Sequence, residues 1–260
     1  MTCLFNHCIY CLPLHSSVSI APPSTTFIDE IFGIKITSTI QCLSCLDSFD
    51  REEDLLSLAL SVHNVNSLTD AFTEFVKQEM IENDCVNCGK NSSKAKRITC
   101  GKLPPILIIY MKKYLYSTSA IKLLNQVNYE EYLDTSPYIT SYFTESNKEN
   151  QYVYSSNNLY RLYGFICHEG PTPQQGHYYS YIRSSDDNWF LANDDDCKTV
   201  SSNKVYNNRD AFVLFYSRVS SASSINISSC QQQQQQQQPR SILTKSNLID
   251  SFNSSVSKSV

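Results

Sequence analysis

The chain has 260 residues, 41% of them hydrophobic and 12% aromatic, which is enough for one large domain or two small ones with a sizeable core. Its net charge of −4 excludes a broad basic surface for nucleic-acid binding. No run approaches the roughly 20 apolar residues that span a bilayer, and the N-terminus lacks the basic region of a signal peptide. We therefore expect a reducing compartment, in which the eleven cysteines favour metal binding over disulfides.

Residues 1–24 come first, and we expect them to be a leader before a folded body that covers residues 25–217. The leader begins with MTCLFNHCIYCLPLH and includes Cys3. Three interpretations of Cys3 are open at this point: a catalytic nucleophile, the remnant of one, or an ordinary cysteine near the N-terminus. The leader by itself does not distinguish them.

Two CxxC pairs follow within the expected folded body. They are Cys42 with Cys45, and Cys85 with Cys88. The two-residue gap lets both thiolates of a pair face one ion, and two such pairs complete a tetrahedral site. Gly89 permits the tight backbone that the second turn needs. The alternative is four free or buried cysteines, but the spacing favours a closed, structural zinc site.

Hydrophobic patterning predicts the secondary structure of the body. Residues 67–80 have apolar side chains at helical spacing, with Ser67 as the N-cap and Asp70 three positions later. Residues 104–116 form a dense apolar run after two prolines, which is typical of a buried central strand. Further strand-like segments cover residues 159–170, 177–184, 188–194 and 210–219. Few helices with many strands at hairpin spacing predict an α+β fold with a largely antiparallel sheet.

One histidine lies in a context that suggests chemistry. His177 begins a strand-like run after a loop rich in Gly and Pro, and Asn193 follows at the end of the next strand-like run. A hairpin would bring the two side chains together, as a base and its orienting group. The alternatives are a structural or surface histidine and, for the acidic run at residues 194–196, a solvated turn.

Residues 218–260 differ in composition from the body. They are rich in Ser and Asn and contain eight consecutive glutamines at residues 231–238. Because they offer too few apolar side chains for a core, we expect a disordered tail. The glutamine run has two interpretations, a neutral repeat expansion, which we favour, and an interaction segment.

Five ordered segments together resemble the ubiquitin-specific protease family of cysteine deubiquitinases. They read TTFIDEIFGIKITSTIQCLSC, CVNCGKNSSKAKRITCGKLPPILIIYMKKY, YGFICHEGPTPQQGHYYSYIR, NWFLANDDD and DAFVLFYSRV. One strand departs slightly from the family pattern, because Met111-Lys112-Lys113-Tyr114 stands where Leu-Lys-Arg-Phe is usual. The matching segments are spread over most of the expected folded body.

The resemblance implies a fold and a set of roles. The fold would be a papain-like palm with an antiparallel sheet and a zinc-ribbon fingers extension, with the thumb helices largely absent. His177 matches the general base, Asn193 the third member of the triad, and Asp194 an adjacent acidic residue. The four CxxC cysteines match the zinc site at the fingertips, and the loop at residues 168–175 would lie near the tail of ubiquitin. The implied partners are ubiquitin and ubiquitinated proteins, without nucleic acid or membrane, in the cytosol and/or nucleus.

The family's cysteine box normally lies upstream of a helical thumb, and here only part of its pattern precedes the fingers. Thr2, Cys3, Asn6, Ile9 and Leu12 fall at matching offsets. No residue corresponds to the Asn that supplies the family's oxyanion hole. The match is either a remnant of the box or a coincidence in a cysteine-rich leader.

Three functions are compatible with these segments. The first is thiol-dependent hydrolysis at the C-terminus of ubiquitin, impaired because the nucleophile region is cut short. The second is a non-catalytic module that binds ubiquitin. The third, a zinc ribbon unrelated to ubiquitin, leaves the boxes of His177 and Asn193 to chance. Labelling of Cys3 by a ubiquitin C-terminal electrophile would separate the first from the second.

Overall fold

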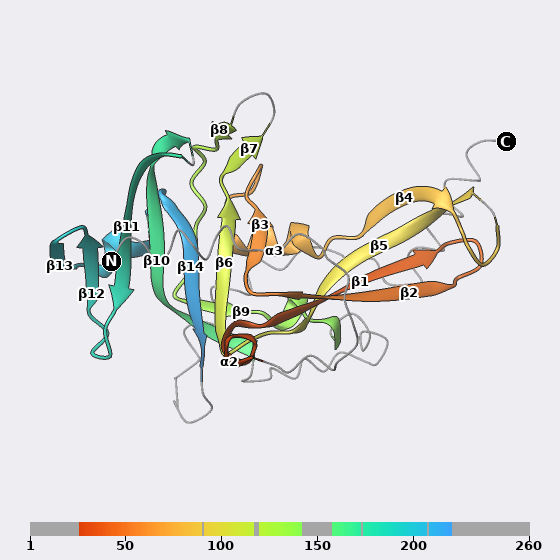
Figure 1. Ribbon diagram of the computed structural model, residues 1–260, viewed down its shortest axis with the longest axis horizontal. Helices are drawn as coiled ribbons and strands as arrows, with labels where there is room; N and C mark the ends of the chain where they lie inside the picture. Colours follow the sequence, from red (N-terminus) through yellow and green to blue (C-terminus); the bar gives the residue numbers. More distant parts are fainter. Residues whose placement is uncertain are drawn as a thin grey trace.

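The computed structural model describes residues 26–89, 91–116, 120–141, 158–172, 174–206 and 208–219. Strands dominate these residues, and the α-helices among them are short (Figure 1). The expected α+β class with a largely antiparallel sheet is therefore confirmed. Within the described ranges, no helix combines the length and the apolar character needed to cross a membrane.

The larger of the two main sheets has the strand order β13-β12-β11-β10-β14-β6-β3, with β9 paired to the start of β10. Its strands are β3 (Leu58–Ser61), β6 (Ile106–Lys112), β9 (Tyr132–Asp134), β10 (Leu159–Thr172), β11 (Gln175–Arg183), β12 (Trp189–Asn193), β13 (Asp196–Val200) and β14 (Ala211–Arg218). All neighbours are antiparallel except β3 and β6, which are parallel. The apolar run of β6 lies between β14 and β3, so the expected inner strand is confirmed.

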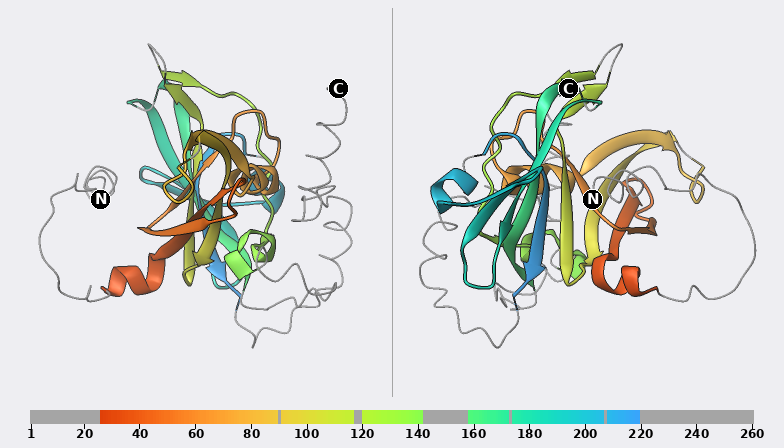
Figure 2. Two further views of the ribbon diagram at one scale, coloured as in Figure 1. Left: turned by 90° about the vertical axis from the view of Figure 1, so that its right-hand side faces the viewer. Right: turned by 60° about the vertical axis from the view of Figure 1, so that its left-hand side comes forward.

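The smaller sheet has the order β2-β1-β5-β4 and extends away from the larger one (Figures 1 and 2). Its strands are β1 (Ile34–Cys42), β2 (Ser48–Leu55), β4 (Glu79–Asp84) and β5 (Asn91–Lys102). The outer strands β2 and β4 are exposed along almost their whole length. The buried apolar side chains of this sheet lie on its inner strands, among them Ile34 and Ile36 of β1 and Cys100 of β5. The far end of the sheet carries both CxxC pairs.

The helix α3 (Leu68–Phe75) begins where the sequence predicts. The Ser67 hydroxyl accepts a hydrogen bond from the Asp70 backbone N–H at 3.0 Å, which satisfies one of the free donors of the first turn. The helix ends earlier than residue 80, because Glu79 and Met80 pair with β5 as the start of β4. Pairing with a distant strand thus overrides helical propensity in the last turn.

Two further α-helices are described, and both are shorter. The helix α2 (Phe27–Phe32) opens with a capping box between Thr26 and Asp29, and α5 (Ser202–Tyr206) buries Val205. A single 3₁₀ turn, η1 (Ser136–Tyr138), brings Tyr138 into stacking contact with Phe72 of α3, with ring centroids 4.7 Å apart. These short elements fasten connecting segments to the core.

The predicted strand over residues 104–116 is interrupted. The strand β6 ends before Lys113, and the chain then forms β7 (Tyr114–Tyr116). The strand β7 pairs with β8 (Ala120–Lys122) in a separate two-stranded hairpin. The Lys113 side chain turns inward and its ammonium group donates to the carbonyl oxygen of Arg209. A buried polar side chain that needs a backbone partner explains the break.

The core lies between the larger sheet and α3. Its largest fully buried apolar side chains are Tyr160, Tyr216, Phe72, Phe165, Ile34, Leu58, Leu60, Leu107, Ile109, Met111 and Leu162. Each buried aliphatic side chain of this kind stabilises a fold by roughly 1.5–3 kcal/mol relative to exposure. The core therefore anchors β10, β11 and β14, which are the strands next to the histidine segment.

The end of the folded body lies slightly beyond the expected boundary at residue 217. Arg218 is the last residue of β14, and its guanidinium group donates to the hydroxyl of Tyr160 at 2.8 Å. The expected leader and the glutamine-rich tail lie outside the described residues.

Candidate functional site

His177 and Asn193 lie on neighbouring strands of the larger sheet. His177 is the third residue of β11, and Asn193 ends β12, with the two strands paired from Ser180 and Ala192 onward. The Nε2 atom of His177 lies 2.5 Å from the Oδ1 atom of Asn193. The structure thus brings together two residues that lie 16 positions apart in the sequence.

The hydrogen bond determines the tautomer of the imidazole. The Oδ1 atom of Asn193 can only accept, so Nε2 of His177 carries the proton and donates it. The other ring nitrogen, Nδ1, then holds a lone pair. The side chain of His177 is 46% exposed, so a reacting group can approach it. This arrangement suits a general base whose orientation is set by an amide.

Asp194 lies close to the same ring. Its carboxylate oxygen Oδ2 is 3.8 Å from Nε2 of His177, and its side chain is 78% exposed. Asp194 and Asp195 form the two-residue turn between β12 and β13, with a positive φ of 50° at Asp194. Asp tolerates this backbone conformation better than most residues. The acidic run is therefore a solvated turn that also places one carboxylate beside the imidazole.

Cys3 is the remaining residue of the expected catalytic set. It lies outside the described residues, and so do the other residues of the partial cysteine box. Of the expected catalytic residues, the structure describes His177, Asn193 and Asp194, and it places the three side chains next to one another.

The segment at residues 168–175 differs from the loop expected from the sequence. Most of it is strand, because β10 continues to Thr172 and β11 resumes at Gln175, which pairs with Thr172. His168, at the start of this segment, is buried, with 1% of its surface exposed. The expectation of a loop over these residues is wrong, because strand pairing continues almost to the tip of the hairpin.

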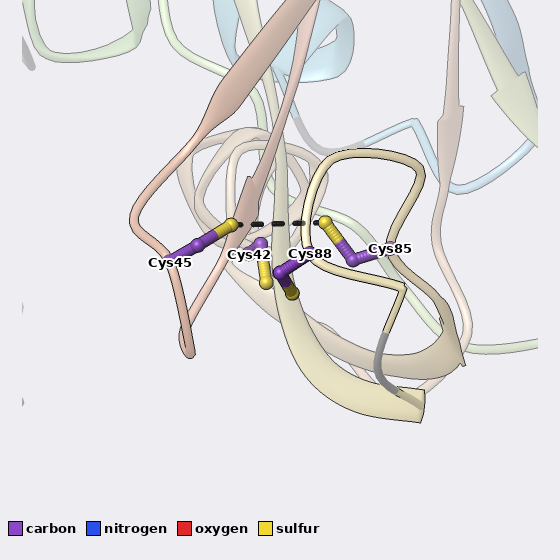
Figure 3. Close-up of side chains that lie close together, drawn as sticks. All are labelled: Cys42, Cys45, Cys85 and Cys88. Carbon is purple, nitrogen blue, oxygen red and sulfur yellow. Dashed lines mark hydrogen bonds between the residues drawn. The ribbon is translucent and has the colours of Figure 1, made fainter.

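The four CxxC cysteines gather at the far end of the smaller sheet (Figure 3). All four Sγ atoms lie within 4.8 Å of one another, and those of Cys45 and Cys85 are 3.7 Å apart. Sulfurs placed tetrahedrally at about 2.3 Å from a zinc ion are about 3.8 Å apart. The cysteines are not joined as disulfides. The predicted clustering is confirmed, and the donor set suits a closed tetrahedral metal site.

A hydroxyl group next to the cluster favours thiolate. The Oγ atom of Ser92 lies 3.2 Å from the Sγ atom of Cys42. This hydrogen bond, followed by that from the backbone N–H of Cys45, lowers the pKa of Cys42 to about 6. Since metal ions bind thiolate, the environment prepares Cys42 for a cation at neutral pH.

The hydrogen-bond partners of Cys42 and His168 were not predicted from the sequence. Ser92 contacts a cysteine 50 positions away, and His168 contacts Tyr114 from 54 positions away. The position of His168 inside the apolar run of β10 indicates burial. Its hydrogen-bond partner, however, depends on which strands are neighbours in the fold. No local pattern marks Ser92 or Tyr114.

The sequence model of the ubiquitin carboxyl-terminal hydrolase family matches residues 14–216 of this chain. Ubiquitin carboxyl-terminal hydrolase creB of Emericella nidulans is 30% identical over 216 residues, which cover 79% of this chain and 27% of that protein. Ubiquitin carboxyl-terminal hydrolase 21 of Arabidopsis thaliana is 29% identical over 209 residues, with the same two shares. The chain thus spans about a quarter of the length of these relatives, 27% of each.

Solved structures share the fold. The SAGA Ubp8/Sgf11/Sus1/Sgf73 DUB module bound to ubiquitin aldehyde includes a chain that matches with a TM-score of 0.65 and 24% identity, over 76% of this chain and 44% of that one. A second structure, of the Ubp8-Sgf11-Sgf73-Sus1 SAGA DUB module, gives a TM-score of 0.62 at 23% identity, over 76% and 42%. The larger sheet corresponds to the palm and the smaller sheet to the fingers. Because the family match extends over most of its length, the chain belongs to the ubiquitin carboxyl-terminal hydrolase family, among the ubiquitin-specific proteases.

Proposed function

We propose that the chain carries the base and the ubiquitin-binding surface of a cysteine-type deubiquitinase, which hydrolyses peptide and isopeptide bonds at the C-terminus of ubiquitin. One observation carries the proposal: the bond from Nε2 of His177 to Oδ1 of Asn193, inside the region that matches the family. A related solved structure is bound to ubiquitin aldehyde, which supports ubiquitin as the partner.

The proposed chemistry assigns one step to each group. Nδ1 of His177 accepts the proton of a thiol, and the resulting thiolate attacks the carbonyl carbon at the C-terminus of ubiquitin. His177 then returns the proton to the leaving amine, and water hydrolyses the thioester that remains. Asn193 holds the ring in the tautomer that makes Nδ1 the base, and Asp194 adds negative charge that stabilises the imidazolium.

We propose that Cys3 supplies the thiol and that catalysis by this chain is impaired. In the partial cysteine box, Phe5 is one position later than the usual aromatic residue, and Tyr10 stands where Gln is usual. We therefore propose that labelling of Cys3 is slow compared with an intact ubiquitin-specific protease.

The four clustered cysteines are proposed to bind a structural zinc ion. Four thiolates leave no open coordination position, so the ion would hold the fingertips together and take no part in hydrolysis. Several apolar side chains beside the cluster are exposed, and such surfaces mark interaction sites. They are Leu46, Phe49, Met80 and Val86. We propose that this end of the fingers contacts ubiquitin, in the cytosol and/or nucleus, where free thiols persist.

The second candidate is a module that binds ubiquitin without cleaving it. The exposed apolar side chains at the fingertips favour this function as much as the first, because binding does not need a nucleophile. The two candidates differ in one respect, which is whether a thiol reacts under the control of His177.

The test is the reaction of the purified chain with a ubiquitin that ends in a thiol-reactive electrophile. We expect slow labelling of Cys3, which disappears in Cys3→Ala and falls on the order of 1,000-fold or more in His177→Ala. Cys197→Ala is the matched control, because Cys197 is an exposed cysteine on β13. Absence of labelling, together with saturable binding of unmodified ubiquitin, would establish the non-catalytic module instead.

A further inference from the structure

A second histidine lies in the same β10–β11 hairpin as His177. His168 is on β10, opposite Tyr178 of β11 in the sheet register, and 1% of its surface is exposed. Its ring packs against Tyr178, with centroids 4.4 Å apart, and against Phe212, with centroids 6.0 Å apart. His168 is thus enclosed on the opposite face of β11 from the side chain of His177.

Polar contacts hold both the ring and the backbone of His168. Its Nδ1 atom lies 2.7 Å from the hydroxyl oxygen of Tyr114. Its carbonyl oxygen accepts from the ammonium group of Lys122 at 2.8 Å, and its backbone N–H donates to the carbonyl oxygen of Asp210 at 2.9 Å. These partners come from β7, β8 and the turn before β14, so three segments converge on one residue.

The ring of His168 also determines how closely the next strand can approach. Gly176 lies against it so tightly that a Cβ atom at this position would be 2.3 Å from Nε2 of His168 and 2.6 Å from the carbonyl oxygen of Glu169. Only glycine fits there. Since Gly176 precedes His177 directly, the position of the His168 ring fixes the backbone from which the His177 side chain projects.

No hydrogen bond to a described residue accounts for the second ring nitrogen of His168. Nε2 of His168 is buried and makes no hydrogen bond within the part of the chain that the structure describes. A buried nitrogen without a partner destabilises a fold, because the group loses its bonds to water and gains none in return. A leucine or phenylalanine would fill this space without that penalty, so its presence points to a role in the hairpin beyond packing.

We propose that His168, anchored by Tyr114, is a positioning residue for His177. The Tyr114 bond fixes the rotation of the His168 ring, the ring supports Gly176, and Gly176 sets the approach of His177 to Asn193. Burial, followed by the charge of Lys122, lowers the pKa of His168, so the ring stays neutral within the hairpin. Only the catalytic use of this orientation rests on the proposed function; the orientation itself can be measured without it.

The test measures the tautomer of His177 directly. Long-range ¹H–¹⁵N spectra of the full chain resolve the two ring nitrogens of each histidine and report which of them carries the proton. In the parent chain we expect His177 to be protonated on Nε2 alone. Tyr114→Phe removes one oxygen atom, and His168→Phe keeps a ring but removes both nitrogens. In each variant we expect the two nitrogen signals of His177 to move toward each other, as the single tautomer is lost.

The matched control is Tyr160→Phe. It removes the hydroxyl of another buried tyrosine, which donates to Pro104 at 2.7 Å and accepts from Arg218 at 2.8 Å, at the opposite end of β10. We expect the His177 signals to stay unchanged in this variant. Unchanged signals in Tyr114→Phe, or an equal change in Tyr160→Phe, would overturn the proposal. Failure of the ubiquitin electrophile to label the chain would count against the proposed function alone, since the spectra do not depend on it.

Discussion

At the scale of single residues, the two histidines of the β10–β11 hairpin have opposite surroundings. The side chain of His177 is 46% exposed and bonded to an amide, whereas His168 is buried among aromatic rings. An exposed imidazole can exchange protons with a reacting group, whereas a buried one is kept neutral by desolvation. Adjacent strands therefore present one histidine that solvent can reach and one that the fold encloses.

Lys113 is a lysine that is buried in an apolar environment. Only 2% of its surface is exposed, although its neighbour Lys112 points to solvent. Burial, the largest cause, lowers the pKa of Lys113 to about 8, and the opposite charge of Asp210 offsets part of that shift. The folded protein therefore holds this proton more weakly than the unfolded chain, in which a lysine has a pKa of about 10.4.

This difference predicts a pH dependence of stability. Below about pH 8 both states hold the proton of Lys113, and the desolvation penalty is present in full. Between about pH 8 and 10.4 the folded state has released the proton that the unfolded state keeps, so the contribution of Lys113 to the free energy of unfolding rises with pH. Burial raises the pKa of the Cys100 and Cys167 thiols to about 12, and these two groups oppose that rise over the same range. The total gain from Lys113 is about 3 kcal/mol by the conversion of pKa shift to free energy. Urea unfolding at a series of pH values measures it.

Two variants isolate the contribution of Lys113. Lys113→Met should remove this contribution, so the free energy of unfolding of the parent chain should rise relative to that of the variant between pH 8 and 10. Lys112→Met should keep the rise, because this neighbouring side chain is exposed. An identical pH dependence in Lys113→Met and the parent chain would show that Lys113 is not responsible.

At the scale of elements, the fingers sheet depends on its tip. Its outer strands β2 and β4 bury almost no side chains, so few apolar contacts hold the end of the sheet that lies away from the core. The four cysteines join the turn after β1 to the turn after β4, so a bound ion would link both hairpins. Metal binding to such a site contributes directly to folding.

Removal of the metal should therefore unfold the fingers and spare the palm. With excess chelator at neutral pH, we expect the amide hydrogens of β1, β2, β4 and β5 to lose protection from exchange. Trp189 is the single tryptophan and is buried in the palm, so its fluorescence should not change. Hydrogen exchange and fluorescence on the same sample make the comparison.

Cysteine variants test the same site without chelator. Cys88→Ser should lower the zinc content from about one ion per chain, because one of the four thiolates that hold the ion is lost. Cys197→Ser is the control, since this exposed cysteine lies on β13 of the palm. Equal zinc content in both variants would contradict the four-cysteine site.

At the scale of the whole molecule, one carboxylate joins three parts of the palm. Glu131 lies 2.8 Å from a guanidinium nitrogen of Arg161 on β10 and 2.7 Å from one of Arg183 on β11. It also accepts from the hydroxyl of Tyr206 in α5 at 3.2 Å. The side chain of Arg183 is only 6% exposed, and its guanidinium group lies over the ring of Trp189. This network holds β11 and β12 in register at the end opposite His177.

Glu131→Gln should lower the free energy of unfolding by about 3 kcal/mol near neutral pH, because it leaves the buried charge of Arg183 with only the exposed carboxylate of Asp187, 3.9 Å away. Burial raises the pKa of Glu131, but the hydrogen bonds from Arg183 and Arg161 outweigh it, so the pKa lies below the usual 4.5. A lowered carboxyl pKa stabilises the fold above the unfolded value, and that contribution is lost as pH falls below about 4.3.

The effect of Glu131→Gln should therefore shrink in acid. Urea unfolding at pH 7 and at pH 3 checks both parts of this prediction. Glu169→Gln is the control, because Glu169 is an exposed carboxylate on β10, the strand that carries Arg161. A loss of stability that is equal at both pH values would mean that the charge of Glu131 is not what stabilises the palm.

Much of the fold was predictable from short-range patterns. The cap of α3 at Ser67 depends on residues three positions apart, and the inner strand β6 on a continuous apolar run. The end of α3 and the break at Lys113 were not predictable, because each depends on a partner far along the chain, β5 in one case and Arg209 in the other. Non-local pairing overrides local propensity at such points.

The residue pattern alone predicts which chemical groups the two sites contain. These are two CxxC pairs, defined by their two-residue gaps, the imidazole of His177, and the side-chain amide of Asn193 in the next strand. The tertiary structure alone decided which of these groups meet. The register of β11 and β12 brings His177 to Asn193, and the pairing of β1 with β5 and of β5 with β4 brings the cysteine pairs together. The fold also brings the hydroxyl of Tyr114 to the ring of His168 on β10. These contacts depend on strand register, which many distant side chains set together through burial of the core.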